Sequence, residues 1–430
     1  MRVLVSRTQN PIPMKTLFHS LVILFLVGQL FAQPDTRMAY PQVKANQSSY
    51  AATHVPIILK EVNTFEFYKE QSENWWKVLE KDMTDEYAWY NYHKANRYAK
   101  LTYSQTHSPT ENWQENTDWI KESTYFMDRK PMEDLIAEHL PESFIYYYIT
   151  ASNNEVKISR EAYLDLISKA HQINPGFAEL YDGFITHYYL TGNIEKRQYY
   201  NKQWFASNDF SPTLLNHYYN VLQSAADQAI LLTYGDNSTF GLLMVQDALG
   251  IRPDVQIING PLLSMDKAYR KRIYEQLAIP LPEVKEGLSF QEGVSRAIMH
   301  LMDHMPANIP LHLNMDLGEA IRAPFQQSLQ QRGLVYTVKK EDDFQSSEMA
   351  KLYEESFQLD YTHTQFTHDP YANSSLSFLN YLPMIMELYP YYLSAGKQEK
   401  ATQLKEWGLK LIERSGRDEV KEWYLGELAG

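Results

Sequence analysis

The chain of 430 residues carries a formal net charge of −13, with 40 Lys and Arg against 53 Asp and Glu, and it contains no cysteine. Nucleic acids and anionic membranes bind clustered Lys and Arg, so this charge balance disfavours both as partners. Without cysteine there is no disulfide bond, no zinc–thiolate site and no acylated lipoprotein cysteine. The length predicts two or three domains, and the 44% of hydrophobic residues are enough for a sizeable core.

The N-terminus has the pattern of a secretory signal peptide. Lys15 precedes a largely apolar run over residues 17–31, and the small residue Ala32 precedes a polar stretch. This pattern is typical of a cleavable export signal, and we predict cleavage after Ala32. Residues 1–13 are interpreted as an extension upstream of the true start at Met14. We therefore expect a periplasmic or secreted bacterial protein, with a retained signal segment acting as an anchor as the alternative.

A polar tether and a helical domain follow the signal peptide. Residues 33–58 contain Pro, Gln and Ser and are interpreted as the tether. Residues 59–226 are helical in pattern, with arms separated by helix breakers such as Pro131, Pro141 and Pro212. This succession predicts antiparallel helix pairs stacked into a helical-repeat domain.

Two helix pairs resemble tetratricopeptide repeats. The first pair has turns at residues 174–176 and 192–193, and Gly183 supplies a small residue where two helices cross. The second pair turns at residues 395–397, within a C-terminal helical region predicted over residues 342–430. Repeats of this kind stack into surfaces that bind peptides or proteins.

Residues 227–341 change to alternating strands and helices, which predicts a separate α/β domain. Apolar runs place its strands at residues 229–234, 255–258, 309–314 and 334–338. The predicted helices occupy residues 240–249, 267–277, 291–305 and 320–332. Because such alternation forms right-handed crossovers, the expected sheet is mainly parallel and part of a three-layer domain. The predicted fold class is α+α/β, with tetratricopeptide-like helical-repeat arms enclosing this small domain.

Polar side chains gather where the predicted strands end, which is where α/β sheets bind ligands. The helix that begins near Thr239 offers free backbone N–H groups and a partial positive charge, so a phosphate, a carboxylate or a polyol fits there. These polar residues, with one Arg before the second strand, are the ligand-binding candidates Asp236, Asn237, Ser238, Thr239, Arg252, Asn259, Asn314 and Asp316. The alternative is that they only form helix caps and turns.

Two pairs of residues, each including one of these candidates, have more specific interpretations. Asp236 and Asp316 together have the chemistry to hold a hard cation. Arg252 is followed two residues later by Asp254. A turn in which the two side chains pair, or in which Asp254 caps the backbone, is favoured over an anion-binding role for Arg252.

The histidines and hydroxyl residues show no catalytic spacing. His300 and His304 lie four residues apart, but Leu301 stands where a zinc protease would carry Glu. There is also no Gly-x-Ser-x-Gly elbow and no phosphate-binding Gly-rich loop with Lys. We therefore predict no catalytic residue, no metal site and no cofactor.

The stretch Ile-Leu-Leu-Thr-Tyr-Gly-Asp-Asn-Ser-Thr-Phe over residues 230–240, followed by Arg-Pro-Asp-Val at 252–255, resembles one family. It is similar to the soluble C-terminal region of the protein O-mannosyltransferase-like membrane proteins of bacterial envelopes, which carry a Gly-Asp-Asn-Asp-Thr-Phe-Pro motif. The resemblance covers about residues 215–415. Ser238 replaces the second Asp of the motif and Gly241 replaces its Pro. The resemblance implies an envelope location and a link to glycosylation, while the membrane catalytic module of the family is absent from this chain.

These observations predict a non-catalytic exported binding or scaffolding protein, whose helical-repeat surfaces bind an envelope protein or peptide. One alternative is an accessory module that recognises a glycan or a sugar donor in protein glycosylation. A third interpretation is an enzyme with a site at the edge that carries Asp236 and Asp316. Nucleic acid is not expected as a partner, and the mature chain contains no apolar run long enough for a transmembrane span.

Overall fold

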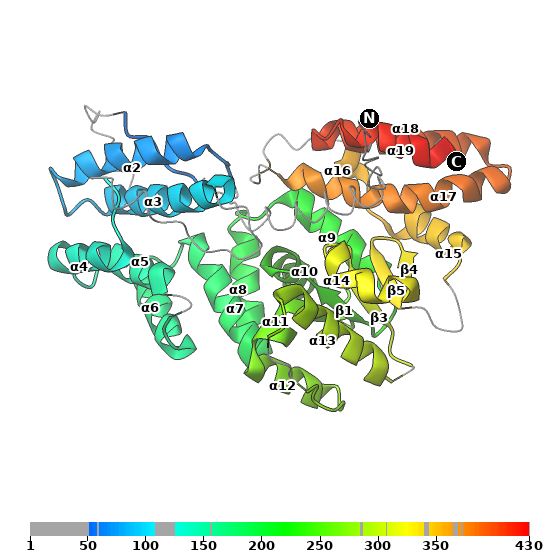
Figure 1. Ribbon diagram of the computed structural model, residues 1–430, viewed down its shortest axis with the longest axis horizontal. Helices are drawn as coiled ribbons and strands as arrows, with labels where there is room; N and C mark the ends of the chain where they lie inside the picture. The colour runs from blue at the N-terminus through cyan, green and yellow to red at the C-terminus, as the bar shows by residue number, and fades with distance from the viewer. Residues whose placement is uncertain are drawn as a thin grey trace, which may run out of the picture. The chain divides into compact units, whose positions relative to one another are not determined.

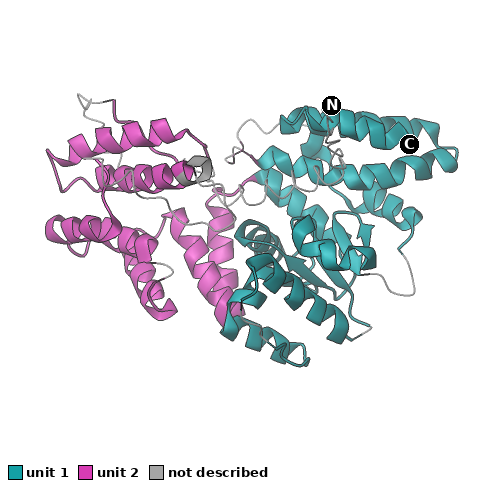
Figure 2. Ribbon diagram, in the orientation of Figure 1, with its two compact units in different colours: residues 1–30, 212–367, 374–430 teal, residues 31–211, 368–373 magenta. Residues whose placement is uncertain are grey.

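The computed structural model describes residues 51–57, 60–107, 125–154, 157–283, 287–306, 308–338, 344–363, 369, 371 and 373–429. The predicted signal peptide, its cleavage site and the tether up to residue 50 lie outside the described residues. The chain is mostly helical and contains a small mixed sheet (Figure 1). Its elements fall into two compact units: residues 212–367 and 374–430 belong to unit 1, and residues 31–211 and 368–373 belong to unit 2 (Figure 2).

Unit 2 consists of helices, and neighbouring helices in the sequence pack together in pairs, such as α2 with α3 and α7 with α8. Its elements are α2 (Phe65–Leu79), α3 (Glu86–His107), α4 (Arg129–His139), α5 (Phe144–Asn154), α6 (Arg160–Ile173), the 3-10 turn η2 (Ala178–Leu180), α7 (Tyr181–Thr191) and α8 (Ile194–Ala206). The break predicted at residues 192–193 is confirmed. Gly192 has a φ of 76° and ends α7, and the Asn193 side chain accepts a hydrogen bond from the Lys196 N–H and caps α8.

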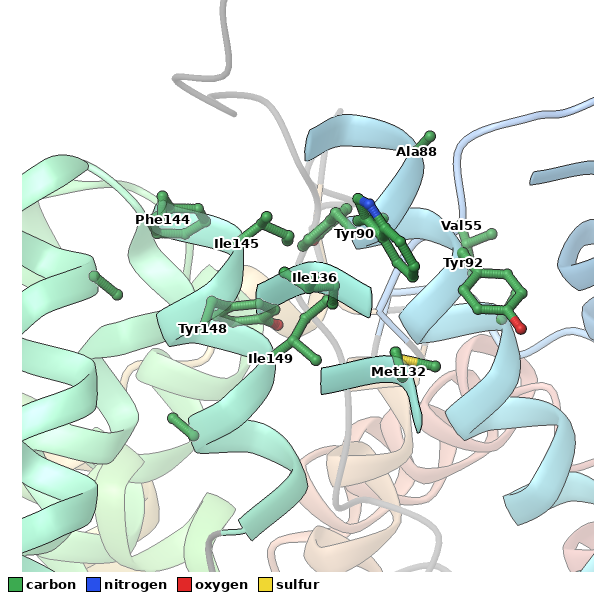
Figure 3. Close-up of a cluster of buried hydrophobic side chains, with 14 of the residues drawn as sticks. Val55, Ala88, Tyr90, Tyr92, Met132, Ile136, Phe144, Ile145, Tyr148 and Ile149 are labelled. Atoms are coloured by element: carbon green, nitrogen blue, oxygen red, sulfur yellow. The ribbon is translucent and has the colours of Figure 1, made fainter. Parts of the chain in front are cut away.

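Aromatic and aliphatic side chains from several helices form the core of unit 2 (Figure 3). In this core Tyr148 stacks on Phe144, with ring centroids 5.7 Å apart, and lies beside Tyr90 of α3. Residues 51–57, at the end of the segment predicted as a tether, pack against this core. The Val55 side chain is buried, and its N–H donates to Asn91 Oδ1 at 2.8 Å. This segment is therefore held by specific contacts with α3.

The first part of unit 1 carries the sheet, and helices connect its strands. The elements are α9 (Pro212–Ser224), β1 (Ile230–Thr233), α10 (Asp236–Leu249), β2 (Gln256–Asn259), α11 (Gly260–Met265), α12 (Lys267–Gln276), α13 (Phe290–His304), β3 (Leu311–Asn314), α14 (Glu319–Arg322), η3 (Ala323–Ser328), β4 (Leu329–Arg332) and β5 (Val335–Val338).

The remainder of unit 1 is helical. It comprises α15 (Ser346–Lys351), the π-helical segment η4 (Leu352–Ser356), α16 (Asp360–His363), the 3-10 segment η5 (Ser374–Tyr381), α17 (Leu382–Ser394), α18 (Gln398–Ser415) and α19 (Val420–Ala429). Helices α17 and α18 pack against each other, with the turn at residues 395–397 between them. In the part of the chain that the structure describes, no helix combines the length and the apolar character needed to cross a membrane.

The sheet has the strand order β2-β1-β3-β5-β4. The predicted parallel pairing is confirmed for β1 with β2 and for β1 with β3. The other two neighbouring pairs are antiparallel, so the sheet is mixed. Strand β5 follows β4 after only two residues, Gly333 and Leu334, and a connection this short cannot cross over to form a parallel pair.

The helix predicted over residues 320–332 is wrong in its second half. Helix α14 ends at Arg322, a 3-10 segment containing Pro324 follows, and residues 329–332 form β4. Gly333 has a φ of 56°, in the left-handed region, which closes the tight hairpin to β5. Residues 329–332 carry no alternating apolar pattern that would predict a strand. Gly333 was therefore the only local sign of a hairpin, and it was overlooked.

Close contact between α9 and α10 depends on Gly241. A Cβ atom at this position would lie 2.1 Å from Tyr218 Cε2, and the Tyr218 ring is buried and held by the surrounding core. We expect Gly241→Ala to lower the free energy of unfolding by about 1–3 kcal/mol, because an added methyl group strains a packed interior. Urea denaturation followed by circular dichroism measures this change.

Gly426→Ala in α19 is the matched control, because nothing lies within 4 Å of a Cβ atom there. That variant should keep or slightly raise the stability, since Ala favours a helix over Gly. Equal stability of the two variants would contradict the close contact at Gly241.

Candidate functional site

The parallel strands of unit 1 bring three chain segments to one edge of the sheet. Strand β1 lies between β2 and β3, and their register pairs Thr233 with Asn259 and Leu232 with Leu313. The chain crosses from β1 to one side to form β2 and then returns to the other side to form β3. The carboxyl end of β1 is therefore a topological switch point, the position where open α/β sheets bind ligands.

The N-terminus of α10 lies directly after β1 at this edge. Gly235 adopts a φ of 84° as the residue before the helix. Asp236, the first helical residue, is exposed. The half-buried side chain of Asn237 forms no hydrogen bond with a described residue, whereas the Ser238 hydroxyl donates to the Tyr234 carbonyl oxygen at 3.1 Å. This helix end thus has both satisfied and unsatisfied polar groups.

Thr239 and Asn259 belong to a buried network that holds β1, β2 and α10 together. The hydroxyl oxygens of Thr233 and Thr239 lie 2.6 Å apart, and Asn259 Nδ2 donates to Thr239 Oγ1 at 3.1 Å. Asn259 Oδ1 also accepts from the Leu262 N–H at 3.0 Å and caps α11. The positions predicted for Thr239 and Asn259 are confirmed at this edge, and both residues stabilise the fold there.

Asp316 is a buried acid at the edge, and only one of its two carboxyl oxygens has a hydrogen-bond partner among the described residues. Its side chain is only 4% exposed. Its Oδ2 accepts from the Tyr234 N–H at 3.3 Å, while Oδ1 has no hydrogen-bond partner among the described residues. Burial raises the pKa of Asp316 to about 7, although the neighbouring polar groups of Ser238 and Asn314 oppose the rise. No described Lys, Arg or His forms an ion pair with this carboxyl group.

Asn314 and Glu319 lie before and after Asp316 on the same connection from β3. Asn314 is buried, and its Oδ1 accepts from the Met315 N–H at 2.9 Å, so it stabilises the turn. Glu319 begins α14, and its Oε2 is buried without a partner among the described residues. Glu319 was not among the candidates predicted from the sequence, because it lies several residues beyond the end of β3. The turn after β3 was the one sequence signal that could have pointed to it.

Two aromatic side chains also lie at this edge. The rings of Tyr234 and Phe290 meet edge to face, with centroids 6.2 Å apart, and Phe290 is 43% exposed. Tyr234 follows β1 directly, so its position is readable from the sequence. Phe290 comes from the start of α13 and reaches the edge only through tertiary packing. An exposed aromatic ring beside polar groups suits a ligand with both apolar and hydroxyl-bearing faces.

Arg252 is not brought to this edge. It lies before the amino end of β2, and its guanidinium forms a bidentate pair with Asp254 through two contacts of 2.9 Å. It also donates to the carbonyl oxygens of Leu222, Ala225 and Ala226 at the end of α9. This pairing holds the pKa of the Asp254 carboxyl well below its usual range. The predicted pairing of Arg252 with Asp254 is confirmed, and Arg252 joins α9 to the start of β2.

The chemistry of the edge favours hydrogen-bond donors as ligands. The α10 N-terminus attracts anions, but the buried carboxyl group of Asp316 lies beside it, and Arg252 lies elsewhere. Of the expected ligands, a polyol therefore fits better than a phosphate or a carboxylate. Among the described residues, no three His, Asp or Glu side chains are grouped so that they could hold a metal ion. His300 and His304 stack on each other, and His300 Nε2 contacts the Pro280 carbonyl oxygen at 2.7 Å.

A second polar cluster, in unit 2, was not predicted from the sequence. The Glu179 carboxylate accepts hydrogen bonds from Tyr90 at 2.5 Å, from Tyr148 at 2.6 Å and from the Lys94 ammonium at 2.7 Å. Burial opposes ionisation of Glu179, but Lys94 and the two hydroxyl groups outweigh it and lower the pKa of Glu179. His54 lies nearby, and burial lowers its pKa to about 4. Because each of the carboxylate oxygens is paired, this cluster serves to join η2 to α3 and α5.

The comparison with protein families places the strand edge inside a recognised region. Residues 215–375 match the family model described as TMEM260-associated domain 2. The match spans the whole sheet and all of the candidate residues from Asp236 to Asp316. No curated protein shows significant similarity to the chain. Residues 215–375 are therefore similar to a domain associated with TMEM260, and this match does not name the O-mannosyltransferase-like family that the sequence motif resembles.

Asp316→Asn tests the unsatisfied carboxyl group. An acid whose pKa is higher in the folded than in the unfolded chain makes stability fall as pH rises from about 4 to about 7, and the loss is complete above that range. We therefore expect Asp316→Asn to be more stable than the wild type at about pH 8, by a few kcal/mol, and to lose this advantage at about pH 4. Denaturant titrations of both proteins across this pH range measure the difference, and a constant difference would contradict it.

Proposed function

We propose that this protein is a non-catalytic binding protein exported to the bacterial envelope, and that its tetratricopeptide-like helical hairpins bind an envelope protein or peptide. Two successions of packed helices, α6 to α8 and α17 to α19, support this proposal. In each, a glycine allows close approach of a tyrosine. A Cβ atom at Gly183 would lie 2.7 Å from Tyr163 Oη, and one at Gly408 would lie 2.1 Å from Tyr424 Oη. Small residues at helix crossings are typical of such repeats.

Export is supported by the signal-peptide pattern, with cleavage proposed after Ala32. The absence of cysteine excludes a lipid-modified cysteine as the means of attachment. Periplasmic or secreted localisation therefore belongs to the proposal. The resemblance of residues 230–255 to the O-mannosyltransferase-like membrane proteins supports a role beside envelope glycosylation.

The observation that carries the partner-binding proposal is a pair of exposed apolar side chains on α8, which packs against α7 as a helical hairpin. Ile194 is 58% exposed at the start of α8, and Tyr199 of the same helix is exposed as well. Covering exposed apolar side chains with a partner removes them from water, which makes the free energy of binding more favourable. This hairpin is the surface that we assign to the partner.

The variant Ile194→Asp/Tyr199→Asp tests this surface. We expect it to recover the envelope partner at least about tenfold less efficiently than the wild type, because the two new charges must be buried unpaired in the complex. Pull-down from an envelope extract with the predicted mature chain, followed by mass spectrometry, measures the recovery.

Leu249→Asp is the matched control, because Leu249 is 46% exposed at the end of α10 in unit 1, whereas the α7–α8 hairpin belongs to unit 2. It should recover the partner as well as the wild type does. Thermal denaturation of all three proteins shows whether they are equally folded. Unchanged recovery by a folded Ile194→Asp/Tyr199→Asp variant would disprove the role of this hairpin.

A second candidate function is recognition of a glycan or a sugar donor at the strand edge. The unpartnered Asp316 Oδ1, the free amide of Asn237 and the exposed ring of Phe290 favour it. Sugars present hydroxyl groups to polar side chains and apolar C–H faces to aromatic rings. This function would make the domain an accessory to protein glycosylation, without a catalytic step of its own.

A thermal-shift experiment with mannose oligosaccharides tests the second candidate. A ligand at about 100 times its Kd stabilises the folded protein by about 2.7 kcal/mol, so it raises the Tm of the wild type. Phe290→Ala and Asn237→Ala should each reduce the rise, whereas Met299→Ala, another exposed residue of α13, should keep it. A rise caused by inorganic phosphate, or one unaffected by Phe290→Ala, would contradict sugar recognition at this edge.

A further inference from the structure

Helix α12 is locally basic in an otherwise acidic chain. Between residues 266 and 276 the basic side chains of Lys267, Arg270, Lys271 and Arg272 face only Asp266 and Glu275 as acids, which gives a local charge of 4 − 2 = +2. The whole chain has a formal net charge of −13. Because charges in salt solution act over about 8–10 Å, this local charge decides what the helix attracts.

One face of α12 packs on unit 1 and the other is exposed. Tyr269, Ile273 and Tyr274 are buried. Lys267 and Lys271 are exposed and lie one helical turn apart, so their ammonium groups point to the same side of the helix. Figure 1 shows α12 at the lower edge of unit 1, and the helix packs mainly on α11. Its basic face is therefore open to a partner.

The other two basic residues of α12 are held by the protein. The Arg270 guanidinium donates to the carbonyl oxygens of Leu263 and Ser264 at 2.9 and 2.7 Å. The Arg272 guanidinium lies over the Tyr269 ring, 5.2 Å from its centroid. Both groups keep their positive charge and add to the local potential. Lys271 also forms an ion pair with Glu275 of the same helix, with Nζ and Oε1 3.7 Å apart, but both side chains are exposed. Because an exposed pair of this kind is weak in water, Lys267 and Lys271 are the groups available for direct contact with a partner.

Exposed apolar side chains flank this basic face. Met265, directly before α12, is 69% exposed, the largest value for a bulky apolar side chain among the described residues. Leu281, shortly after α12, is 51% exposed. Basic residues beside apolar ones are typical of helices that lie on a membrane surface, where the apolar groups enter the lipid and the lysines contact the headgroups.

We propose that the surface formed by Met265, Lys267, Lys271 and Leu281, which we name the α12 surface, docks on an anionic phospholipid membrane. The charge complementarity between the lysines and the lipid headgroups argues for this partner. Nucleic acid would also attract the lysines, but it offers no apolar layer for Met265 and Leu281. The acidic remainder of the chain is repelled by such a membrane, so contact is confined to this surface of unit 1. The proposal does not depend on the partner or glycan proposed above.

Vesicle co-sedimentation of the predicted mature chain tests the α12 surface. The probes are vesicles of phosphatidylglycerol and phosphatidylcholine in equal parts, and vesicles of phosphatidylcholine alone. We expect binding to the first and not to the second, with weaker binding at high salt. Since each basic residue near an anionic leaflet strengthens binding about fivefold, Lys267→Glu/Lys271→Glu should weaken binding about 25-fold or more. Met265→Ser should weaken it further when combined with these changes.

Lys410→Glu/Lys421→Glu is the matched control, because both lysines are exposed on α18 and α19 and the change in net charge is the same. This variant should bind the anionic vesicles nearly as well as the wild type. Equal binding to both kinds of vesicle, or equal losses in the two double variants, would overturn the proposal. Binding to polyuridylate without binding to vesicles would overturn it as well, and would assign the surface to nucleic acid.

Discussion

Parallel pairing of β1 with β2 and with β3 is the interaction on which the candidate site of unit 1 depends. Backbone hydrogen bonds in this ladder fix Thr233 opposite Asn259 and place the end of β3 on the other side of β1. The N–H of Tyr234 can then reach the carboxyl group of Asp316, although 82 residues separate them in the chain. Without this register, the polar residues that follow the three strands would share no common edge.

Asp316 and Glu179 show how partners, rather than burial alone, set the behaviour of a buried acid. Glu179 is surrounded by a lysine and two tyrosine hydroxyl groups, which lower its pKa despite burial. Asp316 has one backbone donor and no cation, so burial dominates and raises its pKa to about 7. Both carboxylate oxygens of Glu179 accept hydrogen bonds, and the cluster holds helices together. Asp316 Oδ1 has no hydrogen-bond partner among the described residues, so the strand edge is the better candidate for binding a ligand.

In unit 1 some arginine side chains are held by hydrogen bonds within the protein, whereas some lysine side chains are exposed to solvent. Arg252 donates to Asp254 and to carbonyl oxygens at the end of α9, and Arg270 donates to carbonyl oxygens of α11. Lys267 and Lys271 remain at the surface of α12 beside exposed apolar groups. The overall charge of −13 describes the chain as a whole. The distribution of these few side chains decides which surface attracts an anionic partner.

Local sequence patterns determined much of unit 1. Apolar β-rich runs identified β1, β2, β3 and β5, and helix-forming stretches between them predicted the parallel crossovers that place Asp236, Asn259 and Asp316 at one edge. In unit 2 the turn at residues 192–193 was readable because Gly and Asn act through their own backbone and side chain. The hairpin of β4 and β5 was not readable, since residues 329–332 become a strand only by pairing with β5.

The tertiary structure alone decided which polar groups are satisfied. The sequence placed Arg252 among the ligand candidates, but its donors are used by Asp254 and by carbonyl oxygens from α9, which only folding brings near. Phe290 reaches the strand edge from a helix that begins 56 residues after Tyr234, and the Lys94–Glu179 pair spans 85 residues. Sequence patterns report periodicity and local caps, whereas the pairing of a buried charge depends on long-range contacts that no local pattern contains.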